Sequence, residues 1–221
     1  IDIILFATTK NLIEQHNGII QDVGLKSGIF DTDPAALINM YLYNKNLPED
    51  GADVILNIGS QNTTLVVWGQ QFPFFTREIQ ISGYHFTKAV MESHNISFSE
   101  AEILKFEQGA SAIESKVKDE SSDSPFSIQV AEKTVFTSLT EEIRKSLRFY
   151  MKSNPQAFFN NFHLCGGSAP LKGLSGFIAE QLNVNVSLLN PFERFSDYSN
   201  VENPYQYGIA FGLALRGVEN N

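Results

Sequence analysis

The chain has 221 residues, of which 43% are hydrophobic and 12% aromatic, so it can bury one large core or two small ones. Its net charge of -9 repels nucleic-acid phosphates and anionic lipid headgroups, so partners of those kinds are not expected. A single cysteine excludes an internal disulfide and favours a reducing compartment, and no apolar run reaches the roughly 20 residues that span a bilayer. We therefore expect a cytoplasmic globular protein that reaches a membrane only through a partner.

Residues 1–47 predict a strand followed by two helices. Ile1–Ala7 is a continuous apolar run, as expected of a strand buried on both faces. A helix is predicted over Asn11–Val23, and a second over Pro34–Leu42 with Asp33 as its N-cap. Because a buried strand begins at the first residue with no initiator methionine before it, we expect the chain to be a fragment.

The next part of the chain predicts a meander and then alternating helices and strands. The meander strands are expected at Val54–Ile58, Thr63–Trp68 and Phe72–Ile79. The later elements are helices over Phe86–Ser93, from a Ser99–Glu102 capping box to Gln108, and over Val135–Tyr150, Leu171–Leu182 and Tyr205–Leu215, with strands over Phe162–Leu164 and Val184–Leu189. The polar stretch Ser115–Ser127 is expected to be mobile. Together these elements indicate an α/β fold.

The first candidate site is the turn between the first two meander strands. Its residues are Asn57, Gly59, Ser60, Gln61, Asn62 and Thr63. Glycine permits a sharp bend whose backbone N–H groups can converge on an anion, and the hydroxyl groups add donors. An ordinary hairpin turn has the same composition, so this turn alone does not establish a site.

The second candidate is the double glycine between a strand and a helix, at Gly166, Gly167 and Ser168. Two adjacent glycines let a flat ring or a sugar lie on the backbone, and the helix start adds the positive end of a dipole. A plain strand-to-helix turn needs only one glycine, so this alternative explains the second glycine less well. Cys165 is expected to be a small buried hydrophobic residue rather than a nucleophile.

The third candidate is the pair Glu102 and Lys105, three residues apart on one helical face. Taken alone, such a pair is most often an exposed ion pair. The histidines lack the spacing of a metal site, so no structural metal is expected; they are His16, His85, His94 and His163.

The order of these three candidates along the chain resembles the second half of the actin-like (ribonuclease H-like) nucleotide-binding fold. The resemblance extends to the terminal helix, which has small residues at Gly208, Ala210 and Gly212. It covers nearly the whole chain, although each short motif is only moderately specific.

The resemblance implies a role for each motif in binding ATP or ADP. Asn57, Gly59 and Thr63 match the second phosphate turn of the superfamily, Asp-x-Gly-x-x-x-Thr, with one substitution. The Glu102–Lys105 pair would hold the ribose and the adenine edge, and the Gly166 turn would lie against the adenosine. In the superfamily the aspartate helps to hold magnesium through water, so magnesium is expected with the nucleotide in the intact protein, although an amide cannot supply the aspartate's charge.

Within the superfamily the chain is most similar to the PilM family of type IV pilus assembly proteins, with FtsA as a more distant relative. The segments that carry this similarity are Gly24–Leu37, Thr76–Glu78, Leu189–Phe192 and Gly208–Arg216. The similarity implies that residues 1–47 are the remainder of the first lobe and 48–221 the second lobe, with 89–133 as its smaller outer subdomain and 205–221 as a connecting helix. It also implies that the first phosphate loop and an inserted subdomain are missing.

The same resemblance suggests one catalytic residue. In actin-like ATPases a carboxamide or carboxylate ahead of the first connecting helix orients the attacking water, and Asp33 falls at about that place. Its alternative role as a helix N-cap explains the residue equally well.

The function that the resemblance implies is a cytoplasmic adenine-nucleotide-binding scaffold of the pilus assembly platform. Its expected partners are the tail of a PilN-like inner-membrane protein and other pilus assembly proteins. Because Asn57 replaces the magnesium-side aspartate, weak or no ATPase activity is expected. Two alternatives stay open, an active ATPase that drives filament or platform assembly as in FtsA-like proteins, and a relative from the type II secretion platform.

Overall fold

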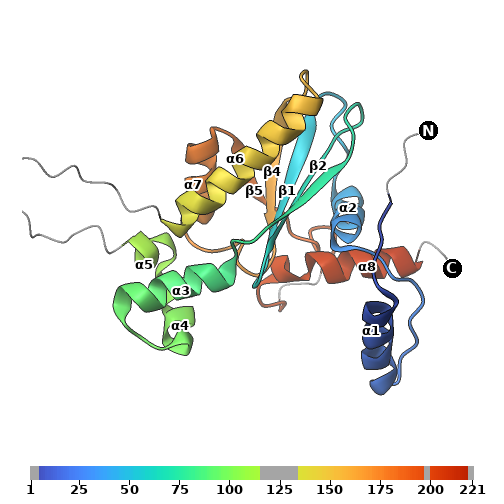
Figure 1. Cartoon of the computed structure of the whole chain (residues 1–221), viewed down its shortest axis with the longest axis horizontal. Helices are drawn as coiled ribbons and strands as arrows, with labels where there is room; N and C mark the ends of the chain where they lie inside the picture. The colour runs from blue at the N-terminus through green and yellow to red at the C-terminus, as the bar shows by residue number, and fades with distance from the viewer. Residues whose placement is uncertain (1–4, 115–133, 197–199, 219–221) are drawn as a thin grey trace, which may run out of the picture.

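The computed structural model describes residues 5–114, 134–196 and 200–218, and its centre is a five-stranded sheet in the order β3-β2-β1-β4-β5 (Figure 1). The strands are β1 (Ala52–Ile58), β2 (Thr63–Trp68), β3 (Phe75–Ile79), β4 (Phe159–Cys165) and β5 (Asn185–Leu188). The helices are α1 (Lys10–Asp22), α2 (Asp33–Asn44), α3 (Gly83–His94), α4 (Phe98–Gln108), α5 (Ala110–Glu114), α6 (Val135–Ser153), α7 (Leu174–Leu182) and α8 (Gly208–Val218), with a 3-10 turn at Pro204–Tyr207.

The sheet is mixed because its connections differ in length. β1, β2 and β3 are joined by short turns and pair antiparallel, which confirms the predicted meander. β4 pairs parallel with both β1 and β5, and α7 makes the crossover between β4 and β5. Since β1 and β4 run parallel, the turns that follow them lie at the same edge of the sheet.

Both faces of the sheet are covered by helices. Alternate residues of β1 point to opposite sides, so Leu56 enters a core with Phe136 and Ile143 of α6, while Ile55 enters a smaller core with Leu37 of α2. Figure 1 shows α6 and α7 on one side, α2 and α8 on the other, and α3 to α5 grouped beside one end of the strands.

Helices α2 and α8 pack unusually closely where they cross. A Cβ atom at Gly212 would lie 1.8 Å from the carbonyl oxygen of Ala36, so glycine is required there. Of the small residues predicted in the terminal helix, Gly208 and Gly212 therefore serve the close contact with α2, whereas Ala210 is exposed.

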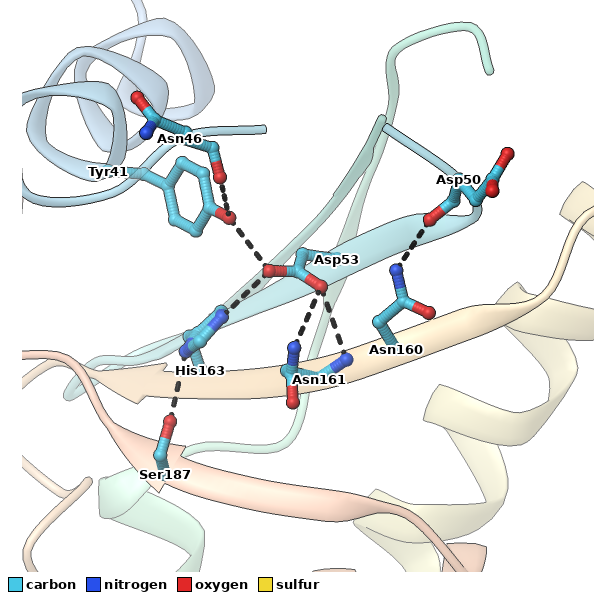
Figure 2. Close-up of polar contacts among 8 residues, drawn as sticks. All are labelled: Tyr41, Asn46, Asp50, Asp53, Asn160, Asn161, His163 and Ser187. Carbon is cyan, nitrogen blue, oxygen red and sulfur yellow. Dashed lines mark hydrogen bonds and ion pairs between the residues drawn. The ribbon is translucent and has the colours of Figure 1, made fainter. Parts of the chain in front are cut away.

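A buried polar network also joins α2 to the sheet (Figure 2). Asp53 Oδ2 accepts a hydrogen bond from the Tyr41 hydroxyl at 2.7 Å and lies 3.0 Å from His163 Nε2. The other carboxylate oxygen accepts the backbone N–H of Asn161 at 3.2 Å. His163 Nδ1 in turn lies 3.0 Å from the hydroxyl oxygen of Ser187, so the network reaches from α2 across three strands.

Several predicted boundaries were wrong. The strand expected at Ile1–Ala7 is not formed by its described part, where Leu5 is 86% exposed; residues 1–4 lie outside the described residues, as does the stretch 115–127. Asp33 is the first residue of α2 and Thr32 takes the N-cap position. The capping box of α4 is formed by Ser97 and Glu100 rather than two residues later. In the part of the chain that the structure describes, no helix is long and apolar enough to cross a membrane.

Candidate functional site

The turn after β1 is closed by its own backbone and docks on the start of α3. The N–H of Gly59 donates to the carbonyl oxygen of Asn62 at 3.0 Å. The carbonyl oxygens of Gly59 and Ser60 accept the N–H groups of Gly83 and Tyr84, each at 2.9 Å. The first candidate turn is therefore held against the N-terminus of α3, which carries the positive end of the helix dipole.

The turn after β4 lies directly beside it. Gly166 has φ +92, in the left-handed region that favours glycine, and a Cβ atom there would lie 2.5 Å from the carbonyl oxygen of Ile58. The N–H of Ser168 donates to that same carbonyl at 3.0 Å. A Cβ atom at Gly83 would meet the Ser168 hydroxyl at 2.3 Å, so three glycine-bearing segments converge at this edge of the sheet.

The Glu102–Lys105 pair belongs to the same cluster through a residue that the sequence analysis missed. Lys105 is 2% exposed, and its Nζ lies 2.6 Å from Glu102 Oε1 and 2.9 Å from Thr87 Oγ1. The Thr87 hydroxyl also contacts Glu102 and donates to the carbonyl oxygen of Gly83 at 2.9 Å. The pair is thus partly buried rather than the exposed ion pair that its spacing alone suggests.

These contacts form one continuous path. It leads from the Gly59 turn to Gly83, from Gly83 to Thr87, and from Thr87 to Glu102. The missing link joins Gly83 and Thr87, which are four residues apart and share a helical face because α3 begins at Gly83, three residues before the predicted helix start at Phe86. A spacing of that kind is too common to single out from sequence.

The remaining predicted residues divide between exposed and structural positions. Ser60 and Gln61 are exposed at the tip of the turn, and Asn62 Nδ2 donates to Glu78 Oε1 at 3.2 Å. Thr63 is buried and its hydroxyl donates to the carbonyl oxygen of Ile81 at 2.7 Å, so that hydroxyl serves the fold.

Asn57 is also buried, at 6% exposure, and its Oδ1 accepts a hydrogen bond from the Cys165 thiol at 3.7 Å. The burial of Cys165 agrees with its predicted role as a small hydrophobic residue. Burial also raises the pKa of this thiol to about 12.

A segment near the C-terminus supports the double glycine, and its role was not predicted. Asn203 Nδ2 donates to the carbonyl oxygen of Gly167 at 2.9 Å, and the N–H of Gly166 donates to the carbonyl oxygen of Tyr205 at 2.8 Å. Above Gly167 the space is open, since a methyl group at its Cβ position would have Gln206 Cβ as its nearest neighbour, at 4.0 Å.

Asp33 occupies a different setting. Its side chain is exposed at the first turn of α2, and it lines a groove of about 850 Å³ between α1 and the segment that precedes α2. None of the other predicted site residues lines this groove.

The arrangement at the sheet edge suits a ligand with an anionic part and a flat part. Backbone N–H groups and the α3 N-terminus favour an anion, the open backbone at Gly167 can accept a ring or sugar, and the half-exposed Glu102 carboxylate can accept hydroxyl hydrogens.

Comparison with solved structures defines the class of protein. The chain is similar to the ethanolamine utilization protein EutJ from Carboxydothermus hydrogenoformans, with 16% identity, a TM-score of 0.65, and coverage of 95% of this chain and 62% of that one. It is also similar to MreB 5 of Spiroplasma citri bound to AMPPNP, with 14% identity, a TM-score of 0.60, and coverage of 97% and 68%. The fold is the actin-like fold.

The family follows from the sequence itself. Residues 1–218 match the family described as "Type IV pilus assembly protein PilM", and the chain belongs to that family. It is 28% identical to the matching chain of a PilM-PilN type IV pilus biogenesis complex, with a TM-score of 0.72 and 93% of this chain covered. The chain spans 57% of the length of that structure.

Proposed function

We propose that this chain is the adenine-nucleotide-binding part of a scaffold in type IV pilus assembly. The observation that carries the proposal is the convergence of the Gly59 turn, the Gly166 turn and Glu102 on the first residues of α3. Family membership supports the pilus role, and the AMPPNP bound to the similar MreB 5 supports the choice of nucleotide.

In this proposal each part of the cluster binds one part of ATP or ADP. The N–H groups of Ser60 and Gln61 bind the phosphates, while the N–H of Gly59 closes the turn by donating to the carbonyl oxygen of Asn62. The backbone at Gly166 and Gly167 lies against the adenosine, and Glu102 accepts hydrogen bonds from the ribose hydroxyls. Lys105 holds the Glu102 carboxylate and, being 2% exposed, contributes little direct contact to the ligand.

The scaffold role extends to partners and to the arrangement of the chain. A PilN-like inner-membrane protein is the proposed partner, because the chain is similar to PilM in a PilM-PilN complex. Through it the protein would lie in the cytoplasm at the inner membrane. The proposed division keeps residues 1–47 in one lobe and 48–221 in the other, so that a nucleotide at the sheet edge can set the angle between them.

A variant at Gly167 tests nucleotide binding. Gly167→Val adds a side chain in the open space where the adenosine is proposed to lie, at a position whose Cβ atom would have no neighbour closer than 4.0 Å. We expect calorimetric titration of the natural protein with ADP to show binding, and the variant to bind about tenfold more weakly or worse.

The matched control is Gly176→Val, because this exposed glycine of α7 also has open space around its Cβ position. It should leave the affinity unchanged. The proposal is wrong if the natural protein binds neither ADP nor ATP, or if both valine variants bind as well as the natural protein.

A further inference from the structure

Three buried, uncharged side chains lie side by side next to the phosphate turn, one each from β1, β2 and β4. We call this group the neutral floor of the turn. Asn57 is in register with Thr64 of β2 and Cys165 of β4, so the three lie side by side on one face of the sheet. They are 6%, 1% and 0% exposed. Burial raises the pKa of the Cys165 thiol to about 12, so at neutral pH the thiol is uncharged and can donate a hydrogen bond.

The hydrogen bonds within this floor leave donors unused. The thiol donates to Asn57 Oδ1, which directs the oxygen of the amide into the protein. Among the described residues no group accepts a hydrogen bond from the Asn57 amide nitrogen, and Thr64 Oγ1 is buried without a hydrogen-bond partner. The unused N–H groups of the Asn57 amide can donate to an anionic oxygen, whereas a cation would need acceptors. The Thr64 hydroxyl is fully buried, so it lies out of reach of a ligand and adds no charge to the floor.

The floor does not fit the magnesium ion that the actin-like resemblance implies. Magnesium is held by oxygen ligands, above all carboxylates. Around the turn, Glu78 lies on β3 and accepts from Asn62, and Glu102 is paired with Lys105. Within residues 5–114, 134–196 and 200–218, no group of three or more His, Cys, Asp or Glu side chains is arranged to hold a metal.

We propose that this chain binds the phosphates of its nucleotide through neutral donors and does not require a divalent cation for binding. This inference rests on the proposed nucleotide binding and specifies its chemistry. An aspartate at position 57 would repel the phosphates unless a cation lay between them, which is the usual reason for metal dependence at such a turn. An amide removes that repulsion, and its N–H group adds an attraction. Any magnesium that arrives with ATP is then held by the phosphates alone.

The test compares ADP binding with and without metal. Calorimetric titration of the natural protein should give dissociation constants in excess magnesium and in EDTA that agree within about threefold. A loss of affinity of about tenfold or more in EDTA would overturn the inference while leaving the proposed function intact. Absence of ADP binding under both conditions would overturn the proposed function and this inference with it.

Variants of the turn make the comparison sharper. Asn57→Asp should bind ADP in magnesium and lose about tenfold or more in EDTA, because the new carboxylate faces the phosphates. Gln181→Glu adds the same charge at an exposed position of α7, outside the phosphate turn, and should show a much smaller metal effect.

Asn57→Ala keeps the test decisive if a buried aspartate prevents folding. It removes the donor without adding charge, so its affinity should fall equally in magnesium and in EDTA. A fall in magnesium alone would show that Asn57 acts through a metal and would refute the inference.

Discussion

The two residues of the Glu102–Lys105 pair should differ in how much stability their replacement costs, because the ammonium group of Lys105 is buried and the carboxylate of Glu102 is partly exposed. Glu102→Gln leaves a nearly buried cation without its counter-charge, whereas Lys105→Met removes the cation and leaves a carboxylate that water can still reach. We expect Glu102→Gln to lower the free energy of unfolding by about 1–3 kcal/mol and Lys105→Met to cost less. Urea denaturation measures both changes.

Lys88→Met is the matched control for this prediction. Lys88 pairs with Glu92 at 3.8 Å, but its side chain is 57% exposed, so the change should cost no more than about 0.5 kcal/mol. Equal costs for the Glu102 and Lys88 variants would mean that burial gives the Lys105 ammonium no special need for its partner.

At the scale of residues, the sequence predicted which groups carry the candidate site better than it predicted their contacts. The spacing of Glu102 and Lys105 indicated a pair, but their link to Thr87 comes from another helix. The N-cap of α4 shows why local patterns fail to fix the first residue of a helix. Ser97 and Ser99 are each followed by glutamate three residues later, so two overlapping capping boxes are possible, and only the position of the first helical residue selects Ser97.

The docking of α2 on the sheet depends on a carboxylate whose charge is stabilised. Burial alone would raise the pKa of Asp53, but hydrogen bonds from His163 and Tyr41, the charge of His163 and the N–H of Asn161 outweigh it and lower the pKa. A lowered pKa in the folded state contributes stability above the unfolded pKa, near 3.9, which is lost as the pH falls through the folded pKa.

Asp53→Asn should therefore cost most near neutral pH and least in acid. We expect the variant to lose about 2 kcal/mol of unfolding free energy at pH 7, and the difference from the natural protein to shrink below about pH 4. Urea denaturation at several pH values measures this, with Asp50→Asn as a control at an exposed position. A difference that does not change with pH would show that the charge of Asp53 is not what joins α2 to the sheet.

At the scale of elements, apolar runs between glycine-bearing turns predicted the meander, whose first strand is buried on both faces, and the helical repeat of apolar residues predicted the long helix α6, which has one buried face. The same reasoning failed at Ile1–Ala7. An apolar run becomes a strand only where another strand pairs with it, and residues 5–7, the described part of this run, pair with none of the five strands. Residues Leu5 and Phe6 are accordingly exposed in the structure.

At the scale of the whole molecule, the sheet order could not be read from local patterns. The parallel pairing of β1 with β4 places Asn57 beside Cys165, 108 residues further along the chain, and no spacing rule predicts such a contact. The order of the motifs and its resemblance to the actin-like fold supplied this information. The physical reason for this order is visible only in the structure: the two turns can meet at one edge of the sheet only if each of them follows one of two parallel strands.

The candidate site as a whole also determines whether the protein hydrolyses the nucleotide that it is proposed to bind. Catalysis of phosphoryl transfer is almost entirely a matter of position and charge stabilisation, and here the floor of the phosphate turn is a neutral amide while Glu102 is engaged by Lys105 and Thr87. We expect the natural protein to release phosphate from ATP far more slowly than the median enzyme turnover of about 10 per second. Phosphate release measured in excess magnesium checks this, with Gly167→Val showing how much of the signal belongs to the site. Fast release by the natural protein that Gly167→Val abolishes would make it an ATPase, with the exposed carboxylate of Asp33 as the first residue to test, and would rule out a scaffold that only binds nucleotide.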